Sequence, residues 1–162
     1  MWYNILMYIP APMLGMAGEL RVRSELLRRG IGCGKLDFDG GTDIILENGK
    51  KIGVKTSEKP INDKKNYSWK YSFSIRAPQV REAKDGLYTK KFIRRDYTGL
   101  VDYWVFWCIQ DDKFYIIPNS EIGQKISITI PTPEHLRKYN SHGEFRSTSR
   151  FEKYKNNWEQ LR

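Results

Sequence analysis

Residues 101–109, VDYWVFWCI, form a nearly continuous apolar run that contains a single charged residue, Asp102. A run of this kind is typical of a strand that is covered on both faces, in the interior of a sheet. The pair Asp111-Asp112 predicts a turn after it, and Phe114 to Ile117 a further strand that Pro118 ends. Interior strands need helices or other layers against both faces of the sheet, so the run favours an α/β fold.

Other segments complete this architecture. Helical periodicity covers residues 17–29, and a second helix is expected after Ser149, which forms a capping box with Glu152. Residues 67–75 alternate between apolar and polar, as in a half-exposed strand. The order of elements predicts a mixed sheet flanked by helices. A single domain is assigned to residues 17–162, and residues 1–16 are expected to be an apolar arm or an extra strand. The C-terminal helix would bury Phe151, Tyr154, Trp158 and Leu161.

Basic residues clearly outnumber acidic ones. Lys and Arg total 28 against 19 Asp and Glu, which gives a net charge of +9 and a pI near 9.5. Such an excess favours a polyanionic partner, and nucleic acid is the commonest one. Charge is weak support when it stands alone, because many basic proteins bind no nucleic acid.

Several other classes of function lack their signatures. The sequence contains no P-loop, no dinucleotide-binding glycine pattern and no nucleophile elbow. Cys33 and Cys108 lie far apart and form no zinc-binding pattern. His135 and His142 lie in a polar C-terminal stretch, where histidines are usually incidental. The apolar N-terminal segment is too short to span a bilayer, so we expect a cytoplasmic protein with no membrane association.

The first helix carries an acid on its apolar side. On a wheel of about 100° per residue, Glu19 falls inside the apolar arc with Arg23 beside it, while Glu25 falls on the opposite side. A carboxylate that points at a core is costly unless it is paired or binds a cation. Glu19 therefore either forms an i,i+4 pair with Arg23 or contributes to a cation site. The arc itself consists of Leu20, Val22, Leu26 and Leu27.

Asn48-Gly49 between two apolar segments is a strong signal for a β-hairpin. The loop can contain two residues, or three residues with Gly49 in a left-handed bulge. We favour the three-residue loop, since Leu46 and Lys50 can then close it.

The loop length decides which side chains share a face. With a two-residue loop, Asp43 would lie opposite Val54 and point away from Lys55. With a three-residue loop, Asp43 lies opposite Gly53 and shares a face with Lys55, because side chains alternate strictly along a strand.

The favoured register gathers groups that suit a divalent cation. Asp43 and Lys55 would meet near one corner of the sheet, where the helix with Glu19 could also pack. Two carboxylates and the backbone carbonyl of Gly53 or Val54 are oxygen ligands of the kind that Mg²⁺ prefers. The Lys55 ammonium could orient or deprotonate a water, or stabilise charge on a phosphate. Alternatively, Lys55 is a strand-end lysine that extends into water.

These residues resemble the motif of the PD-(D/E)XK nuclease superfamily. The motif has a helix glutamate, a strand Asp, and then an acid or glutamine, an apolar residue and a lysine on the next strand; here Glu19, Asp43 and Gly53-Val54-Lys55 take those places. The resemblance covers residues 17–57 and, more loosely, VDYWVFWCI and FYIIPNSEI, which look like later strands of that family's sheet. Within that superfamily, the chain resembles group I intron homing endonucleases and archaeal Holliday junction resolvases.

The resemblance implies a restriction-endonuclease-like mixed β-sheet and hydrolysis of DNA phosphodiesters with Mg²⁺ or Mn²⁺. Glu19, Asp43 and Lys55 would be the catalytic residues, and Asp43, Glu19 and the carbonyl of Gly53 or Val54 the metal ligands. Superfamily nucleases often act as homodimers, so a homo-oligomer, dimer or higher, is also implied, with the N-terminal arm as a candidate interface.

Gly53 departs from the motif, because it has no side chain to bind metal. Three explanations stay open. Glu19 or another acid nearby completes the shell, the chain is a weakened variant of an active enzyme, or the fold keeps its DNA surface without catalysis. A bound Mg²⁺ keeps several waters, so one missing ligand need not abolish binding. The other acids near enough in sequence are Glu47, Glu58, Asp37 and Asp39.

A set of basic residues in the middle of the chain is expected to contact DNA phosphates, which positions a duplex without reading its bases. The competing hypothesis is a nuclease-fold domain, weakened or inactive, that binds nucleic acid without cleaving it. Tight, salt-sensitive binding of DNA without cleavage in Mg²⁺ or Mn²⁺ would distinguish such a domain from an active nuclease. The set consists of Lys64, Lys65, Lys70, Arg81, Lys84, Lys90, Lys91, Arg94 and Arg95.

Overall fold

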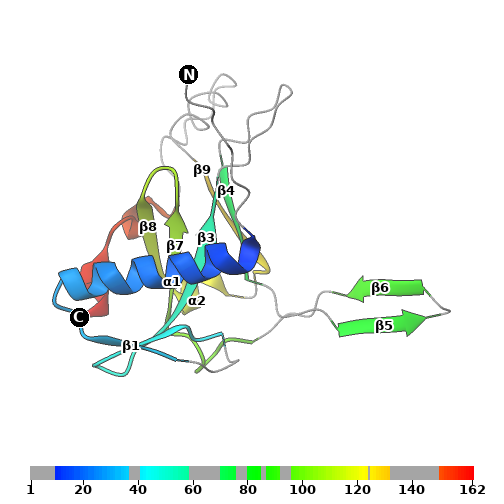
Figure 1. Cartoon of the computed structure of the whole chain (residues 1–162), viewed down its shortest axis with the longest axis horizontal. Coiled ribbons are helices and arrows are strands. Elements are labelled where there is room, and N and C mark those ends of the chain that lie inside the picture. Colours follow the sequence, from blue (N-terminus) through cyan, green and yellow to red (C-terminus); the bar gives the residue numbers. More distant parts are fainter. Residues whose placement is uncertain are drawn as a thin grey trace, which may run out of the picture.

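Five strands form the central sheet in the computed structural model of this chain (Figure 1). They lie in the order β1-β2-β3-β7-β8, and only the pairing of β3 with β7 is parallel. The predicted α/β class with a mixed sheet is therefore confirmed. The strands are β1 (Cys33–Lys35), β2 (Ile44–Leu46), β3 (Lys51–Ser57), β7 (Tyr103–Cys108) and β8 (Lys113–Pro118). The structure describes residues 10–36, 41–58, 70–75, 80–84, 87–91, 96–123, 125–131 and 150–162.

The interior strand β7 is the apolar run that the sequence marked as covered on both faces. Trp104 and Phe106 point into one core, which the β4–β9 strand pair helps to cover, and Val105 points into a second core beneath α1. All three side chains have no exposed surface. The two faces of the sheet therefore belong to two separate apolar clusters, and a side chain's position along a strand decides which cluster it joins.

Helix α1 (Ala11–Arg28) crosses one face of the sheet. It begins at Ala11 rather than at Ala17, because Pro10 lies at its N-cap and Pro12 in its first turn, where proline is well tolerated. Residues 1–9 of the expected arm lie outside the described residues. No helix in the described part of the chain is long and apolar enough to cross a membrane.

The buried side of α1 differs from the predicted arc. Leu20 and Leu27 are 58% and 56% exposed, whereas Gly18, Val22 and Leu26 face the sheet. A Cβ at Gly18 would overlap Thr56 Oγ1 on β3. The absence of a side chain at Gly18 lets the helix approach β3 closely, and this close contact fixes which side of the helix is covered.

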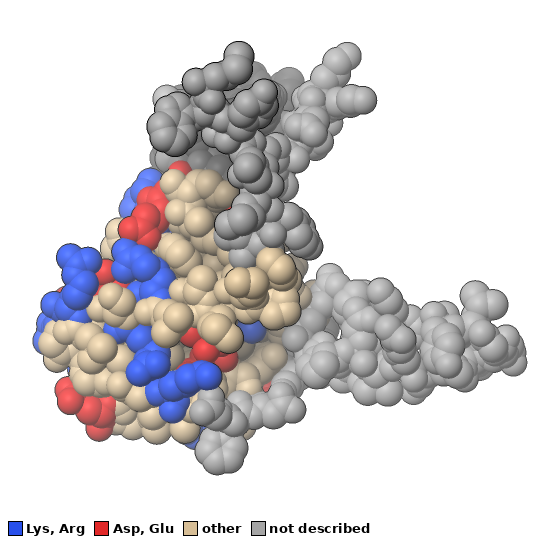
Figure 2. All heavy atoms as spheres, viewed as in Figure 1, with Lys and Arg blue, Asp and Glu red and all other residues tan. Residues whose placement is uncertain are grey.

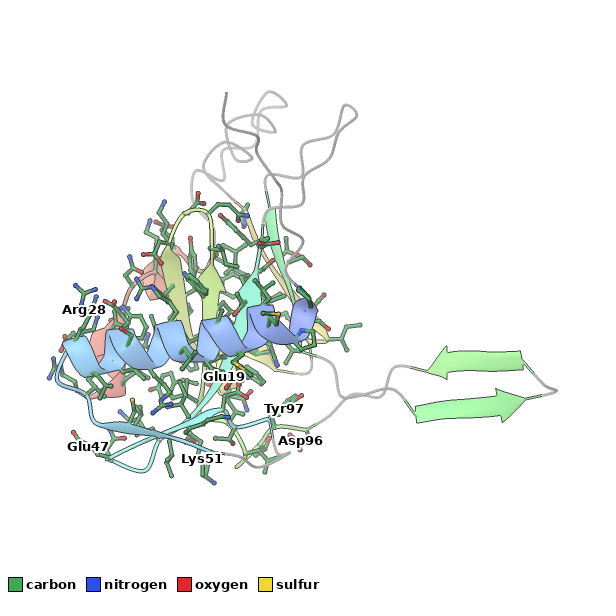
Figure 3. The ribbon with its side chains drawn as sticks, in the orientation of Figure 1. Glu19, Arg28, Glu47, Lys51, Asp96 and Tyr97 are labelled. Atoms are coloured by element: carbon green, nitrogen blue, oxygen red, sulfur yellow. The ribbon has the colours of Figure 1, made fainter. Side chains whose placement is uncertain are left out.

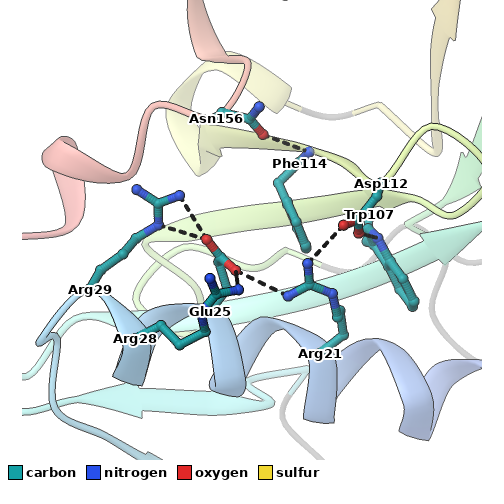
Figure 4. A network of polar contacts seen from close by, with 8 residues as sticks. All are labelled: Arg21, Glu25, Arg28, Arg29, Trp107, Asp112, Phe114 and Asn156. Carbon is teal, nitrogen blue, oxygen red and sulfur yellow. Dashed lines mark hydrogen bonds and ion pairs between the residues drawn. The ribbon is translucent and has the colours of Figure 1, made fainter.

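Glu25, which was expected on the polar side of α1, is buried among arginines (Figure 4). Its carboxylate lies 3.1 Å from Arg21, 3.5 Å from Arg28 and 2.7 Å from Arg29. Arg21 also bonds to Asp112 at 2.8 Å, which ties α1 to the turn between β7 and β8. Burial alone would raise the pKa of Glu25, but the hydrogen bonds and charges of Arg21 and Arg29 lower it on balance.

The C-terminal segment forms two short 3-10 helices, η2 (Glu152–Tyr154) and η3 (Trp158–Leu161), so the prediction of one α-helix was wrong. Asn156 separates them with a φ of 52°, and it pairs with the edge of β8 by accepting from and donating to the Phe114 backbone at 3.0 and 2.7 Å. The predicted apolar stripe is nevertheless buried: Phe151, Tyr154, Trp158 and Leu161.

Two strand pairs complete the structure. β4 (Lys70–Ser74) pairs with β9 (Ser127–Pro131), close to the short helix α2 (Asn119–Ile122). Along residues 71–75 buried and exposed side chains alternate, as the sequence predicted. β5 (Val80–Lys84) and β6 (Leu87–Lys91) form a hairpin that extends from the rest of the chain in Figure 1, and the sequence did not predict it.

Candidate active site

The loop of the β2–β3 hairpin contains three residues. Leu46 N donates to Lys50 O at 2.9 Å, and Gly49, with a φ of 83°, donates to Leu46 O. Ile44 lies opposite Ile52, which sets Asp43 opposite Gly53. The favoured register is therefore confirmed, and Asp43 lies on the face of β3 that carries Lys55.

Asp43 lies directly before β2 begins and continues the pairing with β3. Its backbone N–H donates to Ile52 O at 2.9 Å, and its carboxylate Oδ2 accepts from Val54 N at 2.6 Å. The carboxylate thus satisfies a backbone donor on the edge of β3 that β2 does not reach. Burial raises the pKa of Asp43, against the Val54 hydrogen bond and the positive charge of Lys55, which both lower it. A carboxylate in such a place is stabilised by added positive charge.

Lys55 shares this face with aromatic side chains of β7. It pairs with Phe106 in the parallel register, and its Nζ lies 5.5 Å from the centroid of the Trp104 ring. A cation over an indole face is attracted by the ring electrons, most strongly where water is excluded. The side chain is partly exposed. The Trp104 ring therefore holds the ammonium on the face that carries Asp43, and the positive charge lowers the pKa of that carboxyl. Part of the Lys55 side chain remains open to solvent.

Trp104 also explains the glycine at position 53. The two residues are neighbours across the parallel pair, and a Cβ on Gly53 would lie 2.5 Å from Trp104 Cζ3, 2.6 Å from Cε3 and 3.1 Å from Gly41 O. The indole thus occupies the space into which an acidic side chain at position 53 would project. An acid cannot be accommodated there unless Trp104 moves.

Trp104 is fixed from the side opposite to Gly53. Its Nε1 donates to Asn119 Oδ1 at 2.9 Å, and Asn119 in turn donates to Tyr97 O at 3.3 Å. The Tyr97 ring meets the indole edge to face at a centroid distance of 5.0 Å. Sequence reasoning missed these three residues, because the contact depends on which residue of β7 lies beside Gly53.

Glu19 lies on a different element from Asp43 and Lys55, the helix α1. It is half-buried on α1, which covers the face of the sheet that carries Val54 and Thr56, whereas Asp43 and Lys55 lie on the other face. Figure 3 shows Glu19 at the side of α1 that borders β3. The structure brings Asp43 and Lys55 to one face of the sheet, and the helix that carries Glu19 packs on the other face.

The other acids do not complete a cluster. Glu47 lies in the hairpin loop, next to Gly32, and Glu58 is exposed after the end of β3. Asp37 and Asp39 lie outside the described residues. Among the residues that the structure describes, no three His, Cys, Asp or Glu side chains are close enough to hold a metal ion together. The described groups that share this face are therefore one half-buried carboxylate, Asp43, and one ammonium, Lys55.

The predicted DNA contacts fall partly on described strands. Lys70 begins β4, Arg81 and Lys84 lie on β5, and Lys90 and Lys91 lie on β6, where Arg81 is paired with Lys90. On the described surface in Figure 2, Lys and Arg are prominent over the C-terminal half of α1. The remaining four predicted contacts lie outside the described residues: Lys64, Lys65, Arg94 and Arg95.

Neither the known families nor the curated proteins include a match to this sequence. Among solved structures, the chain is similar to the bacterial homing endonuclease I-Ssp6803I, with a TM-score of 0.66. The two sequences are 17% identical, and the match covers 94% of this chain and 93% of that one. An identity this low establishes the fold alone. The chain therefore shares its fold, over nearly its whole length, with a bacterial homing endonuclease.

Proposed function

We propose that this chain is a DNA endonuclease of the PD-(D/E)XK type that hydrolyses phosphodiester bonds with Mg²⁺ or Mn²⁺. The observation that carries the proposal is the meeting of Asp43 and Lys55 on one face of a mixed sheet whose fold is similar to that of a homing endonuclease. The net charge of +9 supports DNA as the substrate. The active form is a homo-oligomer, a dimer or higher.

The described residues fit a divalent cation in part. Asp43 supplies a carboxylate, the carbonyl of Gly53 or Val54 supplies a second oxygen, and Glu19 is the further carboxylate that we propose. The indole of Trp104 fills the position of the usual third side chain, so water has to complete the shell. When bound, a divalent cation lowers the pKa of a water and neutralises charge on the phosphate.

Lys55 is the residue that would act on the substrate directly. Its ammonium can donate a hydrogen bond to the attacking water or to a phosphate oxygen on which charge develops. The Trp104 ring limits where the ammonium can go, so less freedom is lost when the substrate binds. Asp43 is partly buried, which raises the pKa of its carboxyl, and the same ammonium stabilises the carboxylate as an anion.

A second function, nucleic-acid binding without cleavage, is favoured by one observation. Gly53 has no side chain that could bind a metal, and the Trp104 ring occupies the space that a larger side chain at this position would need. A domain that had lost catalysis but kept its basic surface would show this pattern.

Plasmid nicking in Mg²⁺ or Mn²⁺, measured beside duplex binding, tests both functions. Lys55→Ala should slow nicking by about 10²-fold or more and leave binding nearly unchanged. Lys51→Ala is the matched control, because this lysine lies on the same strand but its Nζ bonds to Gly99 O at 2.9 Å. Duplex binding without nicking in the wild type would favour the second function, and equal nicking by Lys55→Ala and wild type would contradict the role of Lys55.

A further inference from the structure

The Tyr97 ring contacts two different parts of the candidate site. It meets the indole of Trp104 edge to face, with the ring centroids 5.0 Å apart and the planes at 90°. It also packs against Gly41, where an added Cβ would lie 2.5 Å from Tyr97 Cε1. The Lys55 ammonium lies over Trp104, and Gly41 precedes Asp43 by two residues. One half-buried aromatic ring therefore touches the residues that support both groups.

The backbone before Asp43 is shaped for its contact with Tyr97. Gly41 has a φ of 85°, a conformation that glycine adopts readily, and the Tyr97 ring fills the space that a side chain at this position would need. Thr42 is buried, and its Oγ1 donates a hydrogen bond to Leu100 O. The two residues that lead into Asp43 are therefore both tied to the turn that begins at Tyr97.

The Tyr97 backbone is also held in place. Leu100 N and Val101 N both donate to Tyr97 O at 3.0 Å, which closes the turn. Asn119 Nδ2 donates to the same oxygen at 3.3 Å, and Asn119 Oδ1 accepts from Trp104 Nε1 at 2.9 Å. The phenol ring is thus fixed relative to the indole by a direct contact and by a shared amide side chain. In an interior packed this closely, a displaced ring displaces its neighbours.

Both groups of the candidate site depend on these supports. The Asp43 carboxylate accepts from Val54 N at 2.6 Å, and it can keep this bond only while the backbone before it keeps its path. The Lys55 ammonium is attracted to the face of the Trp104 ring, so its place follows the place of the indole. Loss of the Tyr97 ring would leave a cavity between the two supports, and the surrounding structure relaxes into such a cavity in part.

We propose that Tyr97 is a positioning residue that sets Asp43 and Lys55 in place together, the first through Gly41 and the second through Trp104. The inference rests on the proposed function, because hydrolysis of a phosphodiester requires these two groups in a defined arrangement. Tyr97 is assigned no contact with DNA or metal. Misplacement of a reacting group by about 1 Å can slow a reaction by roughly 10²-fold, so a ring behind the site can govern its rate.

Amide hydrogen exchange of the full chain, without DNA or metal, tests the placement of Asp43. The Val54 amide reports on it directly, because it donates its proton to Asp43 Oδ2. In Tyr97→Leu the Val54 amide should exchange about tenfold faster or more, since this contact opens locally. The Leu46 amide, which donates to Lys50 O in the same hairpin, is the reference and should keep its wild-type rate. Tyr97→Phe keeps the ring and should exchange like wild type at both amides.

Tyr103→Leu is the matched control. This half-buried tyrosine of β7 packs against the apolar cluster beneath α1, so its loss should leave the Val54 amide at the wild-type rate. The inference is overturned if Tyr97→Leu leaves Val54 exchange unchanged, if it speeds Val54 and Leu46 alike, or if both tyrosine variants speed Val54 equally. Should Tyr97→Leu fail to fold, Asn119→Ala takes its place with the same expected and overturning results, because it removes one bond to Tyr97 O and keeps the ring.

Plasmid nicking tests the consequence for the reaction. Tyr97→Leu should lower kcat by about tenfold or more and leave the KM for the plasmid nearly unchanged, because the ring positions groups without binding DNA. Tyr97→Phe should nick at the wild-type rate. A raised KM with an unchanged kcat would assign the ring to DNA binding and overturn the positioning role. If wild type does not nick while Val54 exchange responds as expected, the proposed function fails and the placement of Asp43 by Tyr97 stands.

Discussion

At position 53 a side chain of any size meets the indole of Trp104, because the two residues are neighbours across the parallel pair β3–β7. The indole is held in turn by Asn119 and by the Tyr97 ring. The place of the acidic side chain that the motif has at position 53 is therefore filled by the Trp104 ring. Adding the missing acid alone would push against a buried and doubly anchored ring.

The cost of a side chain at this position can be measured with Gly53→Ala. Overpacking of a tight core typically costs about 1–3 kcal/mol, so the free energy of unfolding from denaturant titration should fall by this order. Gly34→Ala on β1 is the control, since its Cβ would lie 3.8 Å from Ile45 Cγ2, an ordinary contact. Equal stability of the two variants would contradict the packing explanation for Gly53.

Glu25 is the one charged residue among the buried residues of α1. Its side chain is 11% exposed and accepts bonds from Arg21 and Arg29. Because its folded pKa lies below the unfolded value, its contribution to stability is present above the unfolded pKa and is lost as pH falls through the folded pKa.

Glu25→Gln should therefore destabilise the chain by about 1–3 kcal/mol at neutral pH, since three arginines lose their shared counter-ion and, among the described residues, only Arg21 keeps another, Asp112. The deficit should shrink in acid, where the wild-type carboxylate is itself protonated. Thermal unfolding across pH measures both effects. Glu159→Gln, in an exposed pair with Arg162 at 3.0 Å, is the matched control and should change stability by no more than about 0.5 kcal/mol. A deficit that does not vary with pH would contradict the ionic role.

At the scale of elements, the seam between α1 and β3 depends on one glycine. Gly18 touches Thr56, while Gly15, less than one turn away, has no neighbouring atom within 4 Å of its would-be Cβ. The same substitution at the two positions therefore separates helix propensity from packing.

Gly15→Ala should stabilise the chain by about 0.5–1 kcal/mol, because alanine loses less backbone entropy in a helix. Gly18→Ala should destabilise it despite the same gain in propensity, since α1 must move away from β3. Thr56→Ala removes the overlapping Oγ1, so the double variant should recover part of the loss. The melting temperatures of wild type, the three single variants and the double variant check this. A stabilising Gly18→Ala would show that the helix can shift at little cost.

The elements that the sequence predicted well are those specified by local chemistry. The hairpin register follows from Gly49 and its loop, and the interior strand β7 follows from its composition. The C-terminal α-helix was wrong because Asn156 turns back to pair with β8, a contact outside the local sequence. Glu25 was misplaced for a similar reason. A helical wheel shows its arginine partners three and four residues away, but it does not show that Arg21 and Arg29 pack over Phe114 and Trp158, which buries this side of α1.

At the scale of the whole molecule, only part of the candidate site could be predicted. Asp43 and Lys55 lie on one face because the same hairpin carries both. The alternation of side chains along its two strands was therefore enough to predict that they share a face. The relation of Glu19 to them depends on how α1 packs against the sheet, and Trp104 reaches Gly53 through a pairing between strands distant in the sequence. Contacts within one hairpin could therefore be predicted from the sequence, whereas contacts between segments distant in the sequence could not.

Charge acts on the scale of the whole molecule, and salt can separate its general effect from local contacts. A protein that makes about 6–10 phosphate contacts loses roughly 10³–10⁵ in affinity between about 50 and 200 mM salt. Replacing Lys90 and Lys91 on β6 by Gln should weaken duplex binding and lower the slope of log affinity against log salt by about two. Replacing the exposed Lys125 and Lys153 by Gln removes the same charge away from the predicted contacts, and should change the slope little. Fluorescence anisotropy with one duplex at several salt concentrations compares them. Equal slopes in the two variants would mean that net charge, rather than the β5–β6 hairpin, attracts the DNA.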